Sequence, residues 1–261
     1  MALIENSLYG VIDRVADAIK LLKELCPPDG YYVAFSGGKD SIVIKDLVIK
    51  SGVKYDIHYS VTTVDPPELI RYIREYHPDV IWDYPEISMY KLIVLKKMPP
   101  TKRVRYCCEY LKERGGEARS IIMGIRREES IRRSKRKLIE FCNKKSKINI
   151  CPILEWSESD VWEYIKINSL PYCCLYDEGF KRIGCVGCPM AGKKRIKDFE
   201  RYPKFKKAYI KAFDKMIKQL TNVNNNWKTG EDVFRWWMEE DSKEDESGTL
   251  FEDNNKMPEG V

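Results

Sequence analysis

The stretch YYVAFSGGKDSIVI, residues 31–44, reads as a short buried strand, a glycine turn and the start of a helix. Two adjacent glycines let the backbone take positive φ angles and bring its N–H groups close to an anion. A helix N-terminus adds N–H donors that have no partner within the helix. The spacing differs from the Walker pattern G-x-x-x-x-G-K-[ST]. The turn therefore predicts a phosphate-binding loop made of Ser36, Gly37, Gly38, Lys39, Asp40 and Ser41.

Further segments with strand character follow this loop and alternate with helical segments. We expect strands over residues 31–35, 55–62, 80–84, 120–125 and 149–153. Such alternation indicates an α/β fold with a parallel sheet and helices on both of its faces. Ligands of these folds bind outside the carboxyl ends of the strands, where the glycine loop lies.

Three helix starts have recognisable signals. Apolar residues at helical spacing from Leu8 to Leu22 predict an amphipathic N-terminal helix. A second helix is expected to begin with Asp65 as its N-cap and Pro66 as its first helical residue. Ser157 is expected to cap a third helix over residues 161–167.

The pattern changes after residue 200, where only helical periodicity remains. Residues 1–200 are therefore expected to form the nucleotide-binding domain, which includes the clustered cysteines. Residues 201–240 would form a helical C-terminal appendage that contains Trp236 and Trp237. Residues 241–261 are acidic and poor in apolar side chains, so we expect a disordered tail.

The net charge of +6 conceals basic segments between residues 126–147 and 181–218. Such segments suit a nucleotide, a nucleic acid or an acidic protein, although a solvated lysine-rich surface is the simpler explanation. No stretch approaches the roughly 20 apolar residues that a membrane span needs. The first 25 residues lack the continuous apolar region of a signal peptide. We therefore expect a cytoplasmic protein with no membrane contact.

The loop sequence Ser-Gly-Gly-Lys-Asp-Ser resembles the pyrophosphate loop of the adenine-nucleotide α-hydrolase-like (PP-loop) superfamily. That superfamily includes ATP pyrophosphatases and phosphoadenylylsulfate (PAPS) reductases. The resemblance implies their Rossmann-like α/β fold, a parallel five-stranded sheet with helices on both faces. Residues 124–133, GIRREESIRR, resemble the G-x-R-R-x-x-S-x-x-R segment of the PAPS-reductase-like branch. Residues 156–162 and 170–179 also resemble segments of that family, and the likeness covers roughly residues 25–195.

This resemblance implies an adenine nucleotide, ATP with Mg²⁺ in the pyrophosphatases, held by the loop and by several residues outside it. Guanidinium groups suit phosphate or sulfate oxygens. The nucleotide-binding residues outside the loop would be Thr63, Gly124, Arg126, Ser130 and Arg133. The residues expected to stabilise charge during catalysis are Lys39, Arg126 and Arg127.

Nine cysteines without an export signal argue for metal ligation or redox chemistry rather than disulfides. The pair Cys107-Cys108 and the later Cys185-x-x-Cys188 resemble the arrangement that holds a [4Fe–4S] cluster in adenylylsulfate (APS) reductases. Cys173 is a contender for one of the four positions, and structural zinc is the alternative to iron–sulfur.

Three functions are consistent with these features. ATP-dependent activation of a substrate for sulfur transfer ranks first, with a nucleic-acid acceptor or a sulfur-donor protein as partner. Reduction of PAPS or APS with an unconventional thiol ranks second, because the resembling reductases use a cysteine near the C-terminus and no cysteine follows Cys188 here. A non-catalytic subunit that senses nucleotide or redox state ranks third.

Overall fold

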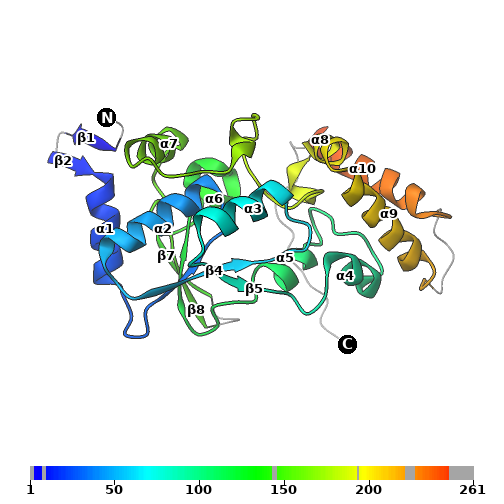
Figure 1. Ribbon diagram of the computed structural model, residues 1–261, viewed down its shortest axis with the longest axis horizontal. Helices are drawn as coiled ribbons and strands as arrows, with labels where there is room; N and C mark the ends of the chain where they lie inside the picture. The colour runs from blue at the N-terminus through cyan, green and yellow to red at the C-terminus, as the bar shows by residue number, and fades with distance from the viewer. Residues whose placement is uncertain (1–2, 8–9, 143–145, 193, 221–226, 247–261) are drawn as a thin grey trace. The chain divides into compact units, whose positions relative to one another are not determined.

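The computed structural model describes residues 3–7, 10–142, 146–192, 194–220 and 227–246, and Figure 1 shows how the described elements follow one another. The chain divides into two compact units, which we describe separately. The first contains the residues up to Glu86 and Cys107–Cys185, and the second contains Ile87–Tyr106 and the residues from Val186 onward. The division therefore does not follow the expected boundary at residue 200.

The first unit is built on a mixed sheet of six strands in the order β5-β4-β3-β6-β8-β7. The five expected strands are present and mutually parallel, and helices lie on both sides of the sheet (Figure 1). The expected count of five was one short, because β7 pairs antiparallel with β8 at the sheet edge. The strands are β3 (Tyr31–Ala34), β4 (Tyr55–Ser60), β5 (Ile81–Asp83), β6 (Ser120–Met123), β7 (Ile139–Cys142) and β8 (Lys147–Ile150).

The apolar core of this unit lies between the sheet and several helices. Val33 of β3 and Ile57 of β4 pack in one cluster with apolar residues of α1, α2, α3 and α7. Burial of this kind stabilises the fold by about 25 cal/mol for each Å² of apolar surface removed from water. The helices of the unit are α1 (Arg14–Glu24), α2 (Lys39–Ser51), α3 (Pro67–Tyr76), α5 (Tyr106–Leu111), α6 (Ile131–Ser134) and α7 (Glu158–Ile167), with short 3₁₀ turns η1 (Arg127–Glu129) and η3 (Cys174–Tyr176).

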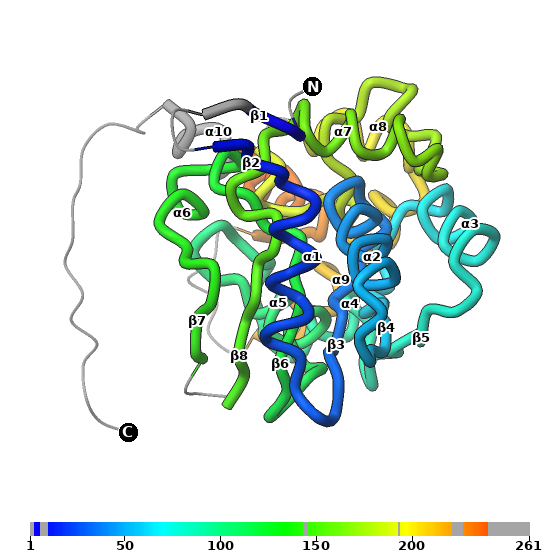
Figure 2. The backbone as a smooth tube through the Cα atoms, turned by 90° about the vertical axis from the view of Figure 1, so that its left-hand side faces the viewer, coloured from blue at the N-terminus to red at the C-terminus, as the bar shows by residue number. Residues whose placement is uncertain are grey.

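Two expected helix starts were wrong, and the third is confirmed. The chain forms a separate antiparallel pair, β1 (Ile4–Ser7) with β2 (Gly10–Asp13), before α1 begins at Arg14 (Figure 2). Leu8 lies outside the described residues. Asp65 is not an N-cap, because its carboxylate accepts hydrogen bonds from the backbone and hydroxyl of Thr62 at 2.8 and 2.7 Å. Pro66 takes the N-cap position instead, whereas Ser157 caps α7 as expected.

Helices dominate the described part of the second unit. They are α4 (Met89–Lys96), η4 (Pro189–Ala191), α8 (Lys194–Arg201), α9 (Pro203–Ile217) and α10 (Gly230–Glu246). Trp237 is 1% exposed and donates from its indole nitrogen to the carbonyl of Pro100 at 2.6 Å. This buried ring is therefore a packing residue rather than a surface for nucleic-acid bases.

The expected limits of the C-terminal parts also change. α10 continues to Glu246, so the acidic stretch begins inside a helix rather than in a tail at residue 241. Residues 247–261 lie outside the described residues. Among the helices that are described, none combines the length and the apolar character needed to cross a bilayer.

A buried polar network connects α2 with the end of α3 in the first unit. The ammonium of Lys45 lies 3.1 Å from Nδ1 of His77 and 2.5 Å from the carboxylate of Asp79. Nε2 of His77 lies 2.7 Å from the hydroxyl of Tyr72, which donates to the carbonyl of Pro171 at 2.8 Å. Burial, assisted by the charge of Lys45, lowers the pKa of His77 from 6.5 to about 4.

This shift predicts a loss of stability in mild acid. Between pH 6.5 and 4 the unfolded state takes up a proton on His77 that the folded state does not, so the free energy of unfolding falls as the pH falls. We expect a contribution of about 2 kcal/mol after solvent screening. Urea unfolding of the wild type and of His77→Gln at pH 7, 5.5 and 4.5 measures it. An equally steep pH dependence in both proteins would contradict the assignment.

Candidate functional site

The loop from Ser36 to Ser41 connects β3 to α2 at the carboxyl end of the central parallel strands. Gly37 has a φ of +69°, which L side chains adopt only with strain. A Cβ atom at this position would lie 2.7 Å from Leu69 and 2.8 Å from Ile73 of α3. Gly37 is therefore needed for its backbone conformation, whereas its contacts with α3 involve side-chain ends that can shift.

The two serine hydroxyls hold the loop in shape. Oγ of Ser41 accepts the backbone N–H of Ser36 at 3.2 Å and donates to the carbonyl of Gly38 at 2.8 Å. The two hydroxyls also lie 3.2 Å apart. The loop is thus preorganised by its own side chains, as an anion-binding turn requires.

Lys39 is 5% exposed, and both its backbone N–H and its side-chain ammonium bond to groups distant in sequence. Its backbone N–H donates to the hydroxyl of Tyr176 at 2.9 Å. Its ammonium donates to the carbonyl of Lys181 at 2.9 Å and pairs with the carboxylate of Glu158 at 3.3 Å. Both the backbone N–H and the ammonium of Lys39 therefore contact protein oxygens in this structure.

Arg126 is the second buried cation of the site. Its Nε donates to Asp40 at 2.6 Å, and its Nη1 lies 3.1 Å from Glu128. Burial alone would lower the pKa of Arg126, but the charge of Asp40 and its hydrogen bond outweigh it and raise the pKa. A Cβ atom on Gly124 would lie 2.9 Å from the backbone of Asp40, so β6 and α2 approach as closely as they do only because residue 124 is glycine.

The other predicted site residues of the 124–133 segment have bonding partners away from the phosphate loop. Arg127 donates to Glu155 at 2.6 Å and to the carbonyls of Ser134 and Arg136 at 2.6 and 2.7 Å. Arg133 pairs with Glu129. Ser130 caps α6 by accepting the N–H of Arg133 at 3.2 Å. The structure thus brings Arg126 to the loop, whereas Ser130 and Arg133 bond within the segment and Arg127 bonds to Glu155 and to carbonyls that follow the segment.

The chain segment after β4 carries a strained backbone. Thr63 has a φ of +65°, which is uncommon for a β-branched residue and is found most often at functional sites. Beside it, the hydroxyl of Thr62 receives the thiol of Cys185 at 3.5 Å and donates to Asp65. The expected nucleotide contact at Thr63 is therefore on a segment that Asp65 stabilises.

Two contacts of the site were not expected from the sequence. Glu158 opens α7, and only its place in the capped Ser157-x-x-Asp160 segment drew attention to it. Tyr176 belongs to the Leu-Tyr-Asp segment, whose resemblance to the family was the one available signal. Both reach Lys39 through tertiary packing, which no local pattern reveals.

The cysteines expected to hold a metal occupy several segments. Cys107 and Cys108 lie on α5, Cys185 lies beside Thr62, and Cys188 precedes η4. Cys173 is completely buried. Across the described residues, no group of three or more His, Cys, Asp or Glu side chains is arranged to hold a metal ion. The iron–sulfur cluster and its zinc alternative therefore stay predictions.

Metal content tests this prediction directly. Anaerobically purified protein is expected to contain about four iron atoms and as many acid-labile sulfides per chain. Cys107→Ser and Cys185→Ser should each lower both contents, whereas Cys142→Ser, on the edge strand β7, should not. Elemental analysis and visible absorption measure the outcome. Stoichiometric zinc without iron would instead support the alternative, and neither metal would contradict both.

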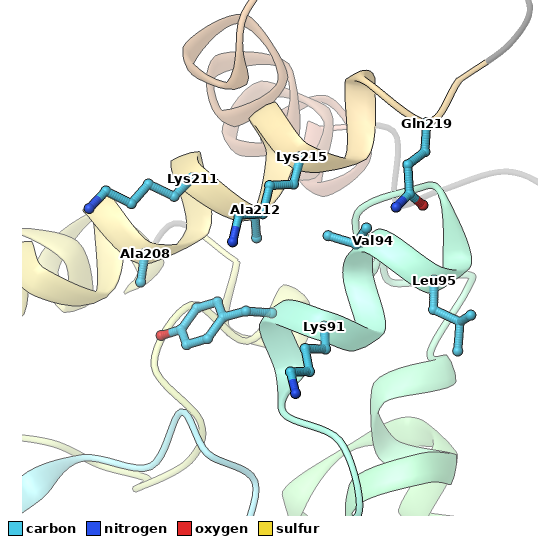
Figure 3. Close-up of a pocket in the computed structure, with 9 residues that line it drawn as sticks. Lys91, Val94, Leu95, Ala208, Lys211, Ala212, Lys215 and Gln219 are labelled. Carbon is cyan, nitrogen blue, oxygen red and sulfur yellow. The ribbon is translucent and has the colours of Figure 1, made fainter.

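Two cavities of the described structure lie away from the loop residues. One of about 750 Å³ in the first unit is lined by Tyr32, His58 and Trp82 with their neighbours. The other, about 490 Å³, is a groove between α4 and α9 in the second unit (Figure 3). Lys91, Lys211 and Lys215 surround apolar side chains there. None of the predicted site residues lines either cavity.

A family model and several sequence relatives match this chain to one family. The model of the phosphoadenosine phosphosulfate reductase domain matches residues 30–191. An adenosine 5′-phosphosulfate reductase of Oceanobacillus iheyensis is 32% identical over 67% of this chain and 79% of its own length. A reductase of the same name from Geobacillus thermodenitrificans is 32% identical over 70% and 81%.

Two other matches are less informative about activity. An uncharacterised protein of Methanocaldococcus jannaschii is 30% identical over 77% of this chain, which spans 51% of that protein. Among solved structures, the phosphoadenylyl-sulfate reductase of Candida auris in complex with phosphate covers 70% of this chain and 97% of its own, at 22% identity and a TM-score of 0.47.

Proposed function

Because the chain belongs to the phosphoadenosine phosphosulfate reductase domain family, we propose that it binds an adenylylsulfate-type nucleotide and reduces its sulfonyl group. The observation that carries this proposal is the match, over two thirds of the chain, to proteins named as adenosine 5′-phosphosulfate reductases. This reverses the order expected from the sequence, in which ATP-dependent sulfur transfer ranked first.

The geometry of the loop supports the binding half of the proposal. The backbone N–H groups at the start of α2 and the ammonium of Lys39 are donors for the oxygens of the nucleotide's mixed anhydride. Arg126, held by Asp40, stands next to them and stabilises the negative charge that develops on the departing phosphate. These are the groups that the site contributes to positioning and charge stabilisation.

The reaction itself requires thiols as electron donors. A thiolate attacks the sulfur, the bond between sulfur and the phosphate oxygen breaks, and AMP leaves with the electron pair. A second thiolate then attacks the sulfur of the first thiol, the bond between that sulfur and the sulfonate breaks, sulfite leaves with the electron pair, and a disulfide remains. Burial raises the pKa of Cys173 to about 11, so this residue is a poor thiolate at neutral pH. This pKa counts against Cys173 as the attacking thiol.

One observation favours a second function. In the printed sequence no cysteine follows Cys188, where the resembling reductases place their attacking residue. ATP-dependent adenylylation of a sulfur acceptor needs no such residue, and it would use the same loop with Mg²⁺. A nucleic acid or a sulfur-carrying protein would then be the partner.

Nucleotide preference separates the two functions without knowledge of an acceptor. A ligand that binds only the folded state stabilises it by RT ln(1 + [L]/Kd), about 2.7 kcal/mol at 100 Kd. We expect APS or PAPS to raise the melting temperature of anaerobic protein more than ATP with Mg²⁺ at the same concentration. A larger effect of ATP with Mg²⁺ would overturn the proposal in favour of adenylylation.

A further inference from the structure

The positive charge of the Lys39 ammonium is already paired with a carboxylate before any ligand binds. Glu158 lies 3.3 Å from it, and the side chain of Lys39 is 6% exposed, whereas that of Glu158 is 47% exposed. Within the described residues this ammonium also donates a hydrogen bond to the uncharged carbonyl of Lys181. Glu158 can therefore turn toward water when a ligand arrives, but its charge remains close to the loop.

Arg126, the second cation of the site, is also paired with carboxylates. Arg126 contacts both Asp40 and Glu128. Glu128 in turn accepts the backbone N–H of Glu158 at 2.7 Å, which places the beginning of α7 beside this ion pair. Among these contacts two cations face three carboxylates, so the positive charges of Lys39 and Arg126 are matched by negative ones.

Such a balance distinguishes between nucleotides by their charge. A triphosphate carries more negative charge than a sulfate joined to one phosphate, and like charges brought close together lower affinity. We propose that Glu158 is a specificity-determining residue, whose carboxylate disfavours polyphosphate at the loop and leaves compact, weakly charged groups such as adenylylsulfate preferred. The inference rests on the proposed function, since it explains how this loop would choose adenylylsulfate over ATP.

The test compares the wild type with Glu158→Gln, which keeps the size of the side chain and the N–H bond to Glu128. Affinities for APS and for ATP are measured by isothermal titration with magnesium chelated, because Mg²⁺ would mask the charge of ATP. We expect the variant to bind ATP at least about fivefold more tightly and APS within about twofold of the wild type. The control is Glu24→Gln on α1, which removes the same charge from a residue paired with Lys20 and should change neither affinity.

The possible outcomes distinguish a failure of the role proposed for Glu158 from a failure of the proposed function. Wild-type protein that binds ATP with Mg²⁺ but not APS refutes the proposed function, whatever the variant does. Wild-type protein that prefers APS, together with an unchanged ratio of ATP to APS affinity in Glu158→Gln, refutes the role of Glu158 alone. A rise in ATP affinity that 0.5 M salt does not reduce also refutes it, because an effect of charge at a half-exposed group must be screened.

Discussion

Gly124→Ala is expected to weaken nucleotide binding more than about tenfold and to lower the free energy of unfolding by about 1–3 kcal/mol. The added Cβ atom would lie 2.9 Å from the carbonyl carbon and oxygen of Asp40, and backbone atoms cannot rotate away as the end of a side chain can. The first turn of α2 must shift instead. That shift displaces the N–H groups of the loop and separates Asp40 from Arg126.

Titration with the nucleotide that the wild type prefers measures the binding loss, and urea denaturation measures stability. Gly184→Ala is the matched control, because a Cβ atom there would meet nothing within 4 Å. Equal behaviour of the two variants would show that the closeness of β6 and α2 has no part in binding.

Arg126→Met is expected to cost about 2 kcal/mol of stability, whereas Arg127→Met should cost less than about 1 kcal/mol. Arg126 has a 3% exposed side chain, and its removal leaves the carboxylate of Asp40, 18% exposed, without its counter-ion. Arg127 and its partner Glu155 are 38% and 61% exposed, so water replaces much of that pair.

The comparison is made by urea unfolding and by nucleotide titration of both variants. Only Arg126→Met should lose nucleotide affinity, since Arg127 donates to backbone carbonyls that follow its own segment. A similar loss of affinity in Arg127→Met would restore the catalytic role that the sequence suggested for this residue.

The strands and the phosphate loop could be predicted because their signals are local. Apolar runs of strand length and a glycine pair are legible without knowledge of the rest of the chain. β7 escaped prediction because its four residues alternate between exposed and half-buried positions at a sheet edge. Asp65 had a good N-cap sequence, but its carboxylate bonds to Thr62 behind it rather than to the helix ahead.

The site was harder to predict than the fold, since its contacts join distant segments. Lys39 and Glu158 meet only when α7 packs near α2. The two neighbouring arginines differ for a geometric reason. Arg126 has extended backbone angles of −123° and 144°, so successive side chains point to opposite sides. The sequence alone does not distinguish Arg126 from Arg127. The extended backbone directs Arg126 to the loop and Arg127 to the surface.

The second unit is assembled from two stretches of chain that are synthesised far apart in time. α4 packs against α9, where the ring of Tyr90 lies 5.3 Å from that of Tyr209. At about 5–20 residues per second, the ribosome needs on the order of ten seconds to proceed from α4 to the end of α9. During that interval the apolar face of α4 has no native partner. Chaperones are therefore expected to bind nascent chains stalled before Pro203 more strongly than chains stalled after Ile217.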